Sequence, residues 1–365
     1  PYRHDVPFRV VNDHGGAVST SDEHVAHTGQ LPEGFPEPEL LTADPARWEP
    51  GGEYLLGSVN QANGGWVSGQ YWMWVLDRAG RVVWAYPTRA TAFTNYVRDT
   101  RDGRDQLWDE ASYWSLWDIG AGSKVHRMKI DGTVTETVAT PGLHHAFLDL
   151  PDGSILWGDA GVDHELLQQH HPGGEVETLW TCGPFFEGLG MSGWCHSNSM
   201  WWNEAENTLI YSFPSDSFVL ELDLASADEL RWWGHIPTDW SFEPADSSFY
   251  KQHGVTLTDD GTLLLSSYVN PLQDVGVVRE YEIDAGTETL RQVWSFGADQ
   301  GIQSHFAGEA HRLAGGNTLH NHGTTPRVRE VTADGDVVWD LTFGGSKLIG
   351  RTLWLDAEAL YDLAP

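Results

Sequence analysis

The chain has 365 residues, of which 40% are hydrophobic, and it contains 19 Trp and 40 Gly. Its formal net charge is −32, and only four of its 21 basic residues are Lys. A surface this acidic repels nucleic acid and anionic membranes, so we exclude both as partners. No apolar run approaches the roughly 18 residues of a membrane-spanning helix. The dispersed acidic residues are typical of a halophilic or marine protein, with recognition of a cationic partner as the alternative.

The first 50 residues are rich in Pro, Gly and charge, and they predict an irregular N-terminal arm that packs on the rest of the chain. The chain begins with Pro1 rather than Met, which suggests a processed start, and we expect a periplasmic or extracellular protein. The two cysteines, Cys182 and Cys195, would suit one local disulfide of an exported chain. Since Cys195 directly precedes His196, such a bridge would also hold that histidine in place.

Beyond residue 50 the chain repeats. Apolar strand starts recur with a spacing of 48 to 56 residues, at Leu55, Leu107, Ile155, Leu209, Leu263 and Leu319. Each unit holds four short strands separated by turn residues, and most units finish in a strand that ends in Trp. Six such units predict an all-β fold, a six-bladed β-propeller with four-stranded antiparallel blades, as one domain over residues 51–365. A pair of β-sandwiches is the alternative fold, but it does not explain the period.

Histidines recur in register with these repeats. His145 and His253 each lie ten residues before the apolar strand start of their unit, and His196 lies thirteen before its own. In the last unit Glu309 takes the ten-back position, and His311 follows two residues later. The leading strand of a propeller unit lines the central channel, so these side chains are expected to converge on the axis. The structural alternative for any one of them is an ordinary strand-end residue.

A histidine cluster of this kind supports more than one chemistry. Histidine can act as nucleophile, general acid or base, or metal ligand near neutral pH. Crowded imidazoles should lower one another's pKa, because each added proton repels the next. Neutral imidazoles suit nucleophilic attack or metal ligation, whereas protonated ones would stabilise an anion. The residues alone leave these possibilities open.

A second pair of histidines adds a metal alternative. His320 and His322, in TLHNHGTT, are two apart on a predicted strand and so share one face. If a divalent metal is bound, its candidate ligands are His145, His196 and His253, and the pair would complete an open site.

The motifs LHHAFLDLPDGSIL, CHSNSMWWNEAENTLIYS, QHGVTLTDDGTLLL and GNTLHNHGTTPRVREVTADGDVVW carry a family resemblance. Through roughly residues 50–345 the chain resembles the arylsulfate sulfotransferase (arylsulfotransferase) family, whose members are six-bladed propellers. The resemblance implies ping-pong transfer of a sulfuryl group from a phenolic sulfate to a phenol through a sulfohistidine, with no cofactor required.

Carried over by motif, the resemblance makes His253 of QHGV the nucleophile. It gives His196 of the HxNS motif, and His145 or its neighbour His144, the task of binding the sulfuryl oxygens and moving the phenol proton. Asn198 of the same motif, with Glu309, His311, His320, His322 and Tyr250, makes up the set of expected substrate-binding residues.

One departure from the family concerns a positive charge. Family members commonly carry an Arg at the end of the strand that follows HxNS, whereas this chain reads YSFPSD there, with Phe213 and Pro214. Arg279 and Arg327 are candidate substitutes, although their sequence contexts predict outer strands and ordinary surface pairing.

Two further functions remain as alternatives. The first is a metal-dependent polysaccharide lyase or hydrolase with a His-ligated metal on the propeller axis, a saccharide substrate and a base such as Tyr250 near His253. The second is a non-catalytic ligand-binding propeller. Under the leading interpretation the partner is a small aromatic substrate.

Overall fold

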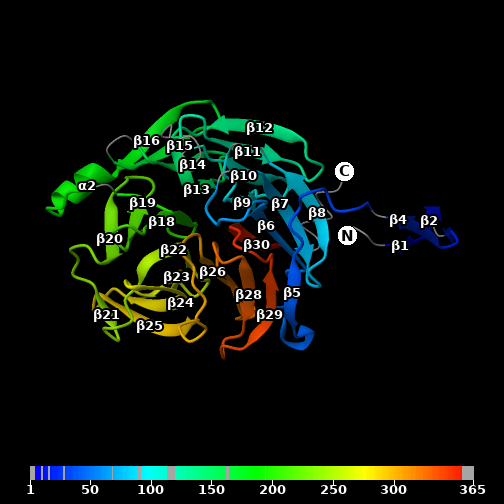
Figure 1. The fold of residues 1–365 in the computed structure, drawn as a ribbon. Helices are drawn as coiled ribbons and strands as arrows, with labels where there is room; N and C mark the ends of the chain where they lie inside the picture. Colours follow the sequence, from blue (N-terminus) through cyan, green and yellow to red (C-terminus); the bar gives the residue numbers. More distant parts are fainter. Residues whose placement is uncertain are drawn as a thin grey trace.

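The computed structural model describes residues 5–9, 11–14, 17–27, 29–67, 69–88, 92–112, 120–161, 164–193 and 195–355. Six antiparallel sheets are arranged as blades around a central axis, which confirms the predicted six-bladed β-propeller (Figure 1). Among the described residues, none of the helices has the length and apolar character needed to cross a membrane.

The first three blades follow one another in the chain, except that the first takes its innermost strand from the C-terminal end. From the axis outward, blade 1 consists of β30 (Ile349–Leu355), β6 (Tyr54–Asn60), β7 (Tyr71–Asp77) and β8 (Val82–Pro87). Blade 2 consists of β9 (Val97–Asp99), β10 (Gln106–Glu110), β11 (Lys124–Met128) and β12 (Val134–Ala139). Blade 3 consists of β13 (Leu143–Asp149), β14 (Ile155–Asp159), β15 (Leu166–His170) and β16 (Val176–Thr181).

The last three blades include two with a fifth strand on the outer edge. Blade 4 consists of β17 (Ser199–Asn203), β18 (Thr208–Phe213), β19 (Phe218–Asp223) and β20 (Glu229–Gly234). Blade 5 consists of β22 (Tyr250–Leu257), β23 (Leu263–Asn270), β24 (Gln273–Asp284), β25 (Thr289–Phe296) and β21 (Ser241–Glu243). Blade 6 consists of β26 (Glu309–Arg312), β27 (Thr318–Asn321), β28 (Arg327–Val331), β29 (Val337–Thr342) and β5 (Glu39–Ala43).

The arm over residues 1–50 is more regular than the sequence predicted. It contains paired strands β1 (Asp5–Phe8) and β4 (His24–His27), paired strands β2 (Val11–His14) and β3 (Ala17–Thr20), and the 3-10 helix η1 (Pro45–Arg47). Strand β5 joins blade 6, whereas β1, β2 and β4 extend away from the blades (Figure 1). The expectation that the whole arm is irregular was wrong, because β5 completes hydrogen bonds along the outer edge of blade 6.

Apolar side chains fill the spaces between neighbouring blades. Every residue of β7, with the sequence YWMWVLD, is buried, as expected for a strand covered on both faces. One cluster joins blades 6 and 1, where Trp339 and Leu341 pack with Trp74 and Leu55. Burial of this kind stabilises the fold by about 25 cal/mol for each Å² of apolar surface removed from water. The contact between the last and first blades therefore closes the ring.

The chain closes by pairing β30 with β6. The sequence left the C-terminal segment open as a strand or a short helix, and residues 349–355 form the innermost strand of blade 1; residues 356–365 lie outside the described part. The expected bridge between Cys182 and Cys195 is present and spans a sequence separation of 13. It ties the start of α2 (Cys182–Gly188) to the residue before His196.

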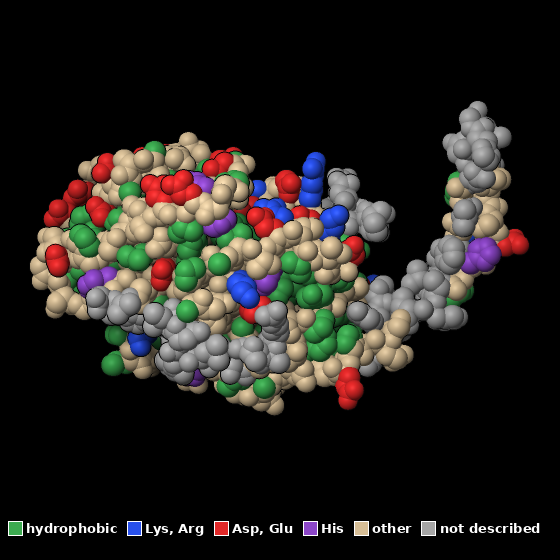
Figure 2. All heavy atoms as spheres, turned by 90° about the horizontal axis from the view of Figure 1, so that it is seen from above, with side chains coloured by type: hydrophobic (Ala, Val, Ile, Leu, Met, Phe, Trp, Pro, Cys, Tyr) green, Lys and Arg blue, Asp and Glu red, His purple; other side chains and the backbone are tan. Residues whose placement is uncertain are grey.

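The outer surface carries many Asp and Glu side chains, as expected from the net charge of −32 (Figure 2). Basic residues are interspersed among them in this view rather than gathered into one broad patch. In this view no extended basic patch of the kind that binds nucleic acid is seen.

Candidate active site

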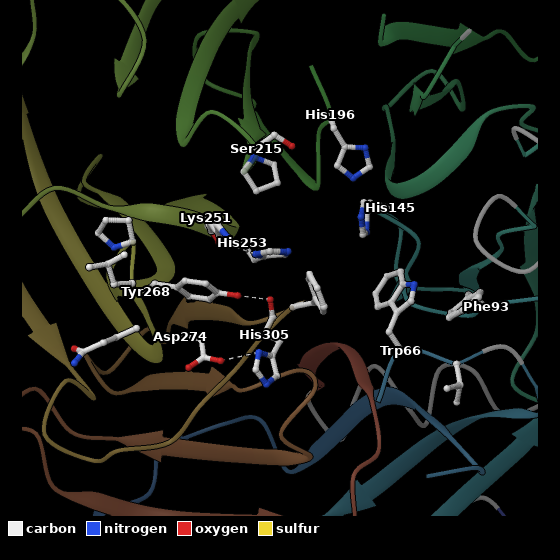
Figure 3. A pocket seen from close by; sticks show the side chains of 16 residues that line it. Trp66, Phe93, His145, His196, Ser215, Lys251, His253, Tyr268, Asp274 and His305 are labelled. Atoms are coloured by element: carbon white, nitrogen blue, oxygen red, sulfur yellow. Dashed lines mark hydrogen bonds and ion pairs between the residues drawn. The ribbon is translucent and has the colours of Figure 1, made fainter. Parts of the chain in front are cut away.

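A cavity of about 1150 Å³ lies at the end of the axis where the innermost strands begin. His145 on β13, His196 just before β17 and His253 on β22 all line it (Figure 3). The ring centroids of His145 and His196 are 5.0 Å apart. The structure thus brings together the three histidines that the repeat register selected, while their chemical roles stay predictions.

The hydrogen bond of His253 determines which of its nitrogens is protonated. Its Nδ1 lies 3.0 Å from the carbonyl oxygen of Lys251. A carbonyl can only accept, so Nδ1 carries the proton and Nε2 keeps its lone pair in the neutral ring. Burial lowers the pKa of His253 to about 4, the carbonyl of Lys251 partly opposes this shift, and the charge of Arg351 adds to it. At neutral pH the Nε2 of His253 is therefore an available nucleophile or ligand.

His144, directly beside His145, is fully buried and has the opposite protonation preference. Its Nδ1 lies 3.2 Å from the carbonyl oxygens of Gly142 and Gly158, and its Nε2 lies 3.1 Å from the carbonyl oxygen of Ser197. The Glu165 carboxylate is 3.4 Å from Nε2. Burial by itself would lower the pKa of His144, but Glu165 and the surrounding acceptors outweigh burial and raise that pKa.

The charge of His144 affects the neighbouring histidines. The ring centroids of His144 and His196 are 4.3 Å apart. Burial is the main reason that the pKa of His196 lies well below its usual value, and the positive charges of His144 and His253 add to the effect. Burial also lowers the pKa of His145, followed by repulsion from His196 and His144. The cluster therefore holds neutral imidazoles next to a buried cation, as the crowding argument predicted for most of its members.

Arg351 on β30 supplies a second, partly buried cation that sequence reasoning missed. Its Nη1 donates to the Glu309 carboxylate at 2.7 Å, and its Nη2 donates to the Tyr96 hydroxyl at 2.6 Å. Burial would raise the pKa of Glu309, but Arg351 and His311 outweigh it and bring that pKa down to about 2. A side chain added at Gly254, the residue after His253, would collide with Arg351. The guanidinium therefore lies against the backbone that carries His253.

The position of Arg351 follows the same repeat register as the histidines. His253 pairs with Ser266, three residues after the strand start Leu263. In blade 1, Thr352 pairs with Gly57, and the register shifts between Ile349 and Thr352. Arg351 therefore lies opposite the part of β6 that follows its strand start Leu55, as His253 lies opposite the part of β23 that follows Leu263. Assigning the C-terminal strand to blade 1 would have revealed it. In blade 2, Val97 pairs with Trp108, one residue after the strand start Leu107, so it does not lie at the level of His253.

Three other expected substrate-binding residues, Asn198, His311 and Tyr250, contact protein groups and do not line the cavity. Asn198 is buried and donates to the carbonyl of Gln252 at 2.7 Å, and His311 pairs with Glu309 at 3.1 Å. Tyr250 stacks on His235, with ring centroids 4.4 Å apart. None of Asn198, Tyr250 or His311 is among the residues found to line the cavity.

His320 and His322 lie on and just after β27, fully buried, with ring centroids 3.9 Å apart. They do not reach the cavity either. Arg279 bonds Gln292, and Arg327 pairs with Asp340, so neither substitute for the missing family Arg reaches the histidines. Both arginines lie on the third strand of their blades, but the predicted surface pairing was wrong, because Arg279 is buried and Arg327 pairs with the buried Asp340.

Two cavity residues, Trp66 and Phe306, escaped the sequence analysis because they lie on connecting loops. Trp66 and Phe306 form an aromatic wall, with ring centroids 6.1 Å apart, and Trp66 also contacts His145. Lys251 and Tyr268 stand across the cavity from Trp66 (Figure 3). Lys251 and Tyr268 lie on β22 and β23, whereas the loops that carry Trp66 and Phe306 differ in length between units, so repeat register gives no signal for those two aromatic residues.

One group of the described residues has the geometry to hold a metal ion. The ligand atoms of His144, Glu165 and His196 lie within 4.8 Å of one another. This set differs from the expected His145, His196 and His253. Because both ring nitrogens of His144 already face carbonyl or carboxylate oxygens, the two-proton form of that ring fits its surroundings better than a metal ligand does.

These features define a β-propeller with a histidine-lined site on its axis. The family model for arylsulfotransferase (ASST) matches residues 180–340, which confirms the resemblance to that family over blades 4 to 6. The matched stretch includes His196, His253 and Glu309. No curated protein matches the chain.

Solved structures support the fold. A protein of unknown function from Bacteroides caccae has 17% identity and a TM-score of 0.54, and the match covers 81% of this chain and 97% of that one. A putative 6-phosphogluconolactonase from Bacteroides uniformis has 14% identity and a TM-score of 0.50, covering 96% and 99%. At these identities the likeness concerns the fold alone.

Proposed function

We propose that the chain transfers a sulfuryl group from a phenolic sulfate to a phenol, with His253 as the nucleophile. The carrying observation is the protonation state of His253, whose Nδ1–H is bound by the Lys251 carbonyl and whose pKa is lowered to about 4. Such a ring is neutral at pH 7 and presents Nε2 as its basic atom. The arylsulfotransferase match supports the choice of reaction.

The reaction proceeds in two halves. In the first, Nε2 of His253 attacks the sulfur, the bond between sulfur and the aryl oxygen breaks, and a phenolate leaves. In the second, the oxygen of an acceptor phenol attacks the same sulfur and the nitrogen–sulfur bond breaks. A neutral imidazole, His145 or His196, takes the acceptor's proton and later returns it to solvent or to the departing phenolate.

The two cations stabilise the charge that develops on the sulfuryl oxygens. The cationic form of His144 is favoured because both ring nitrogens face oxygen acceptors and Glu165 raises its pKa, and Arg351 lies against Gly254. Neither side chain lines the cavity, and their nitrogens already face protein acceptors, so they act on the sulfuryl group through their charge and not as direct hydrogen-bond donors. No cofactor is required by this mechanism. The disulfide is consistent with the proposed periplasmic or extracellular location.

The test is release of 4-nitrophenolate from 4-nitrophenyl sulfate in the presence and absence of phenol, together with metal analysis of the same protein. We expect acceptor-dependent release that survives chelation and falls by about 10³-fold or more in His253→Ala. His171→Ala, at a turn remote from the cavity, is the matched control.

The competing functions have distinct signatures in the same assay. One equivalent of bound metal, with activity lost on chelation, would replace this mechanism by the metal-dependent lyase or hydrolase. Absence of both transfer and lyase activity would leave the ligand-binding propeller.

A further inference from the structure

We infer that the ammonium group of Lys251 is the anion-binding group of the cavity and holds the sulfate end of a multi-ring aryl substrate. The inference rests on the proposed function for the identity of the anion. It adds a substrate-binding residue and a substrate class that neither the repeat register nor the family motifs indicated.

The backbone directs this side chain into the cavity. Lys251 is exposed, lines the cavity and has a φ of 45°, a left-handed conformation that is rare for a residue with a side chain. Its N–H donates to the hydroxyl of Ser217 at 3.0 Å, while its carbonyl accepts from His253 at 3.0 Å. Residues held in such conformations concentrate at ligand sites. The same unusual backbone therefore orients both His253 and the Lys251 side chain.

The charge of Lys251 is not neutralised by a partner. Arg351 is paired with Glu309, and His305 at the cavity wall is paired with Asp274 at 2.7 Å. Among the residues that the structure describes, Lys251 forms no ion pair, and its Nζ lies 5.8 Å from the centroid of the Tyr268 ring. An unpaired cation in the cavity of a protein with a net charge of −32 favours an anionic ligand there.

Lys251 also adjoins the turn that lacks the family's Arg. Pro214 and Ser215 of YSFPSD line the same cavity. The side chain of Gln252 donates to the carbonyls of Phe213 and Phe218 at 3.1 and 2.8 Å, which binds the start of β22 to this turn. A positive charge is thus available from the neighbouring strand where the turn provides none.

The opposite wall indicates what the anion is attached to. Trp66 lies across the cavity from Lys251, with His253 between them (Figure 3). Phe306 also lines the cavity and contacts Trp66. Aromatic walls of this kind bind flat rings. A cavity of about 1150 Å³ exceeds the space that one phenol ring needs and matches drug-sized ligands. The arrangement fits an aryl sulfate with more than one ring.

The experiment measures binding without catalysis. 4-Nitrobenzenesulfonate cannot transfer its sulfonate through His253, and nitrobenzene is its neutral counterpart. Calorimetric titration compares wild type with Lys251→Met, Lys251→Arg and the control Lys129→Met, which removes the same charge from an exposed turn. A two-ring probe, naphthalene-2-sulfonate, is titrated in parallel.

We expect Lys251→Met to weaken sulfonate binding about tenfold, while Lys251→Arg and Lys129→Met bind as wild type and nitrobenzene binds all four alike. Salt should weaken sulfonate binding in wild type more than in Lys251→Met. The naphthalene probe should bind wild type more tightly than the benzene probe. Equal sulfonate affinity in Lys251→Met and Lys129→Met would overturn the role of Lys251, and equal affinity for the two sulfonates would overturn the multi-ring class.

Failure of this inference is distinguishable from failure of the proposed function. If wild type transfers the sulfuryl group and Lys251→Met binds the sulfonate with unchanged affinity, only the proposed role of Lys251 is rejected. If Lys251→Met loses sulfonate affinity but wild type shows no transfer, the anion-binding role of Lys251 is retained and the sulfotransferase activity is rejected.

Discussion

At the scale of single residues, the histidines around the axis differ in charge although they nearly touch. His144 faces carbonyl oxygens and a carboxylate, so it retains both ring protons. His253 faces one carbonyl oxygen and is otherwise buried, so its ring keeps a single proton, on Nδ1. The difference arises from the acceptors around each ring and not from the residue type.

Glu165→Gln should therefore change the titration of its neighbours. Without the carboxylate, the pKa of His144 falls below its raised value, and the pKa values of His145 and His196 rise because a repelling charge is lost. We expect kcat to fall about tenfold or more, while the acid limb that His253 sets near pH 4 stays in place, because His144 is not among the causes of the lowered pKa of His253.

The measurement is an NMR titration of the histidine rings alongside kcat as a function of pH. Glu177→Gln is the matched control, because Glu177 pairs with His171 at the same 3.4 Å distance on the surface. An unchanged His144 titration in Glu165→Gln would show that the carboxylate does not maintain its charge.

Sequence reasoning identified the histidines but not the cations. Periodicity selects residues at equivalent places in successive units, and His145, His196 and His253 satisfy that condition. Arg351 satisfies it too, but its strand lies at the far end of the sequence from the unit it completes. Lys251 is placed by an unusual backbone angle, which no sequence pattern shows.

At the scale of elements, the segment before β17 is fixed at one end by a covalent bond. The disulfide joins Cys182 to Cys195, one residue before His196, and both cysteines are fully buried. His196 itself belongs to no strand, so the bridge and the surrounding hydrogen bonds hold it in place.

Replacing both cysteines by Ser should lower the free energy of unfolding by roughly 3 kcal/mol, the value expected for a loop of about 15 residues. The effect on kcat should exceed that of any substitution remote from the cavity, because His196 gains freedom. Urea unfolding and kcat are measured for the double variant, with reduced wild type as the control. Equal stability in oxidised wild type and the double variant would contradict the prediction.

The strands themselves were largely predictable, and the exceptions share a cause. Alternation and turn residues marked the four strands of each unit, since these signals are local. Strands β5 and β21 add a fifth strand to blades 6 and 5 through contacts with residues remote in sequence or across a long connection. Local patterns do not contain that information, so residues 39–43 were assigned to an irregular arm.

At the scale of the whole molecule, buried histidines connect stability to pH. Burial lowers the pKa of His145, His196, His253, His320 and His322. In the unfolded chain each titrates near 6.5, so between about pH 6.5 and 4 the unfolded state binds protons that the folded state does not. Stability should fall as pH falls through this window. His144, whose pKa is raised, opposes the trend by gaining stability below its folded pKa.

We expect the free energy of unfolding to drop by about 1.4 kcal/mol per pH unit for each histidine that binds a proton only on unfolding. Below about pH 4.5, Glu309 becomes protonated in the unfolded chain but stays ionised in the folded protein, where its pKa is about 2. This difference adds to the loss of stability. Urea unfolding at intervals from pH 7.5 to 4 measures the slope. His322→Asn should reduce it, and His171→Ala should not. A flat profile in wild type would contradict the assignment of these rings as neutral.

The closure of blade 1 by β30 has a consequence for synthesis. A ribosome releases the chain from its N-terminus, so residues 349–355 emerge after every other strand of the six blades. Until they emerge, the first blade lacks its innermost strand, and the axis lacks Arg351, the group that neutralises Glu309. A nascent chain with five finished blades already contains His253 but has no closed site around it. The site around His253 is therefore completed in one late event, when β30 pairs with β6.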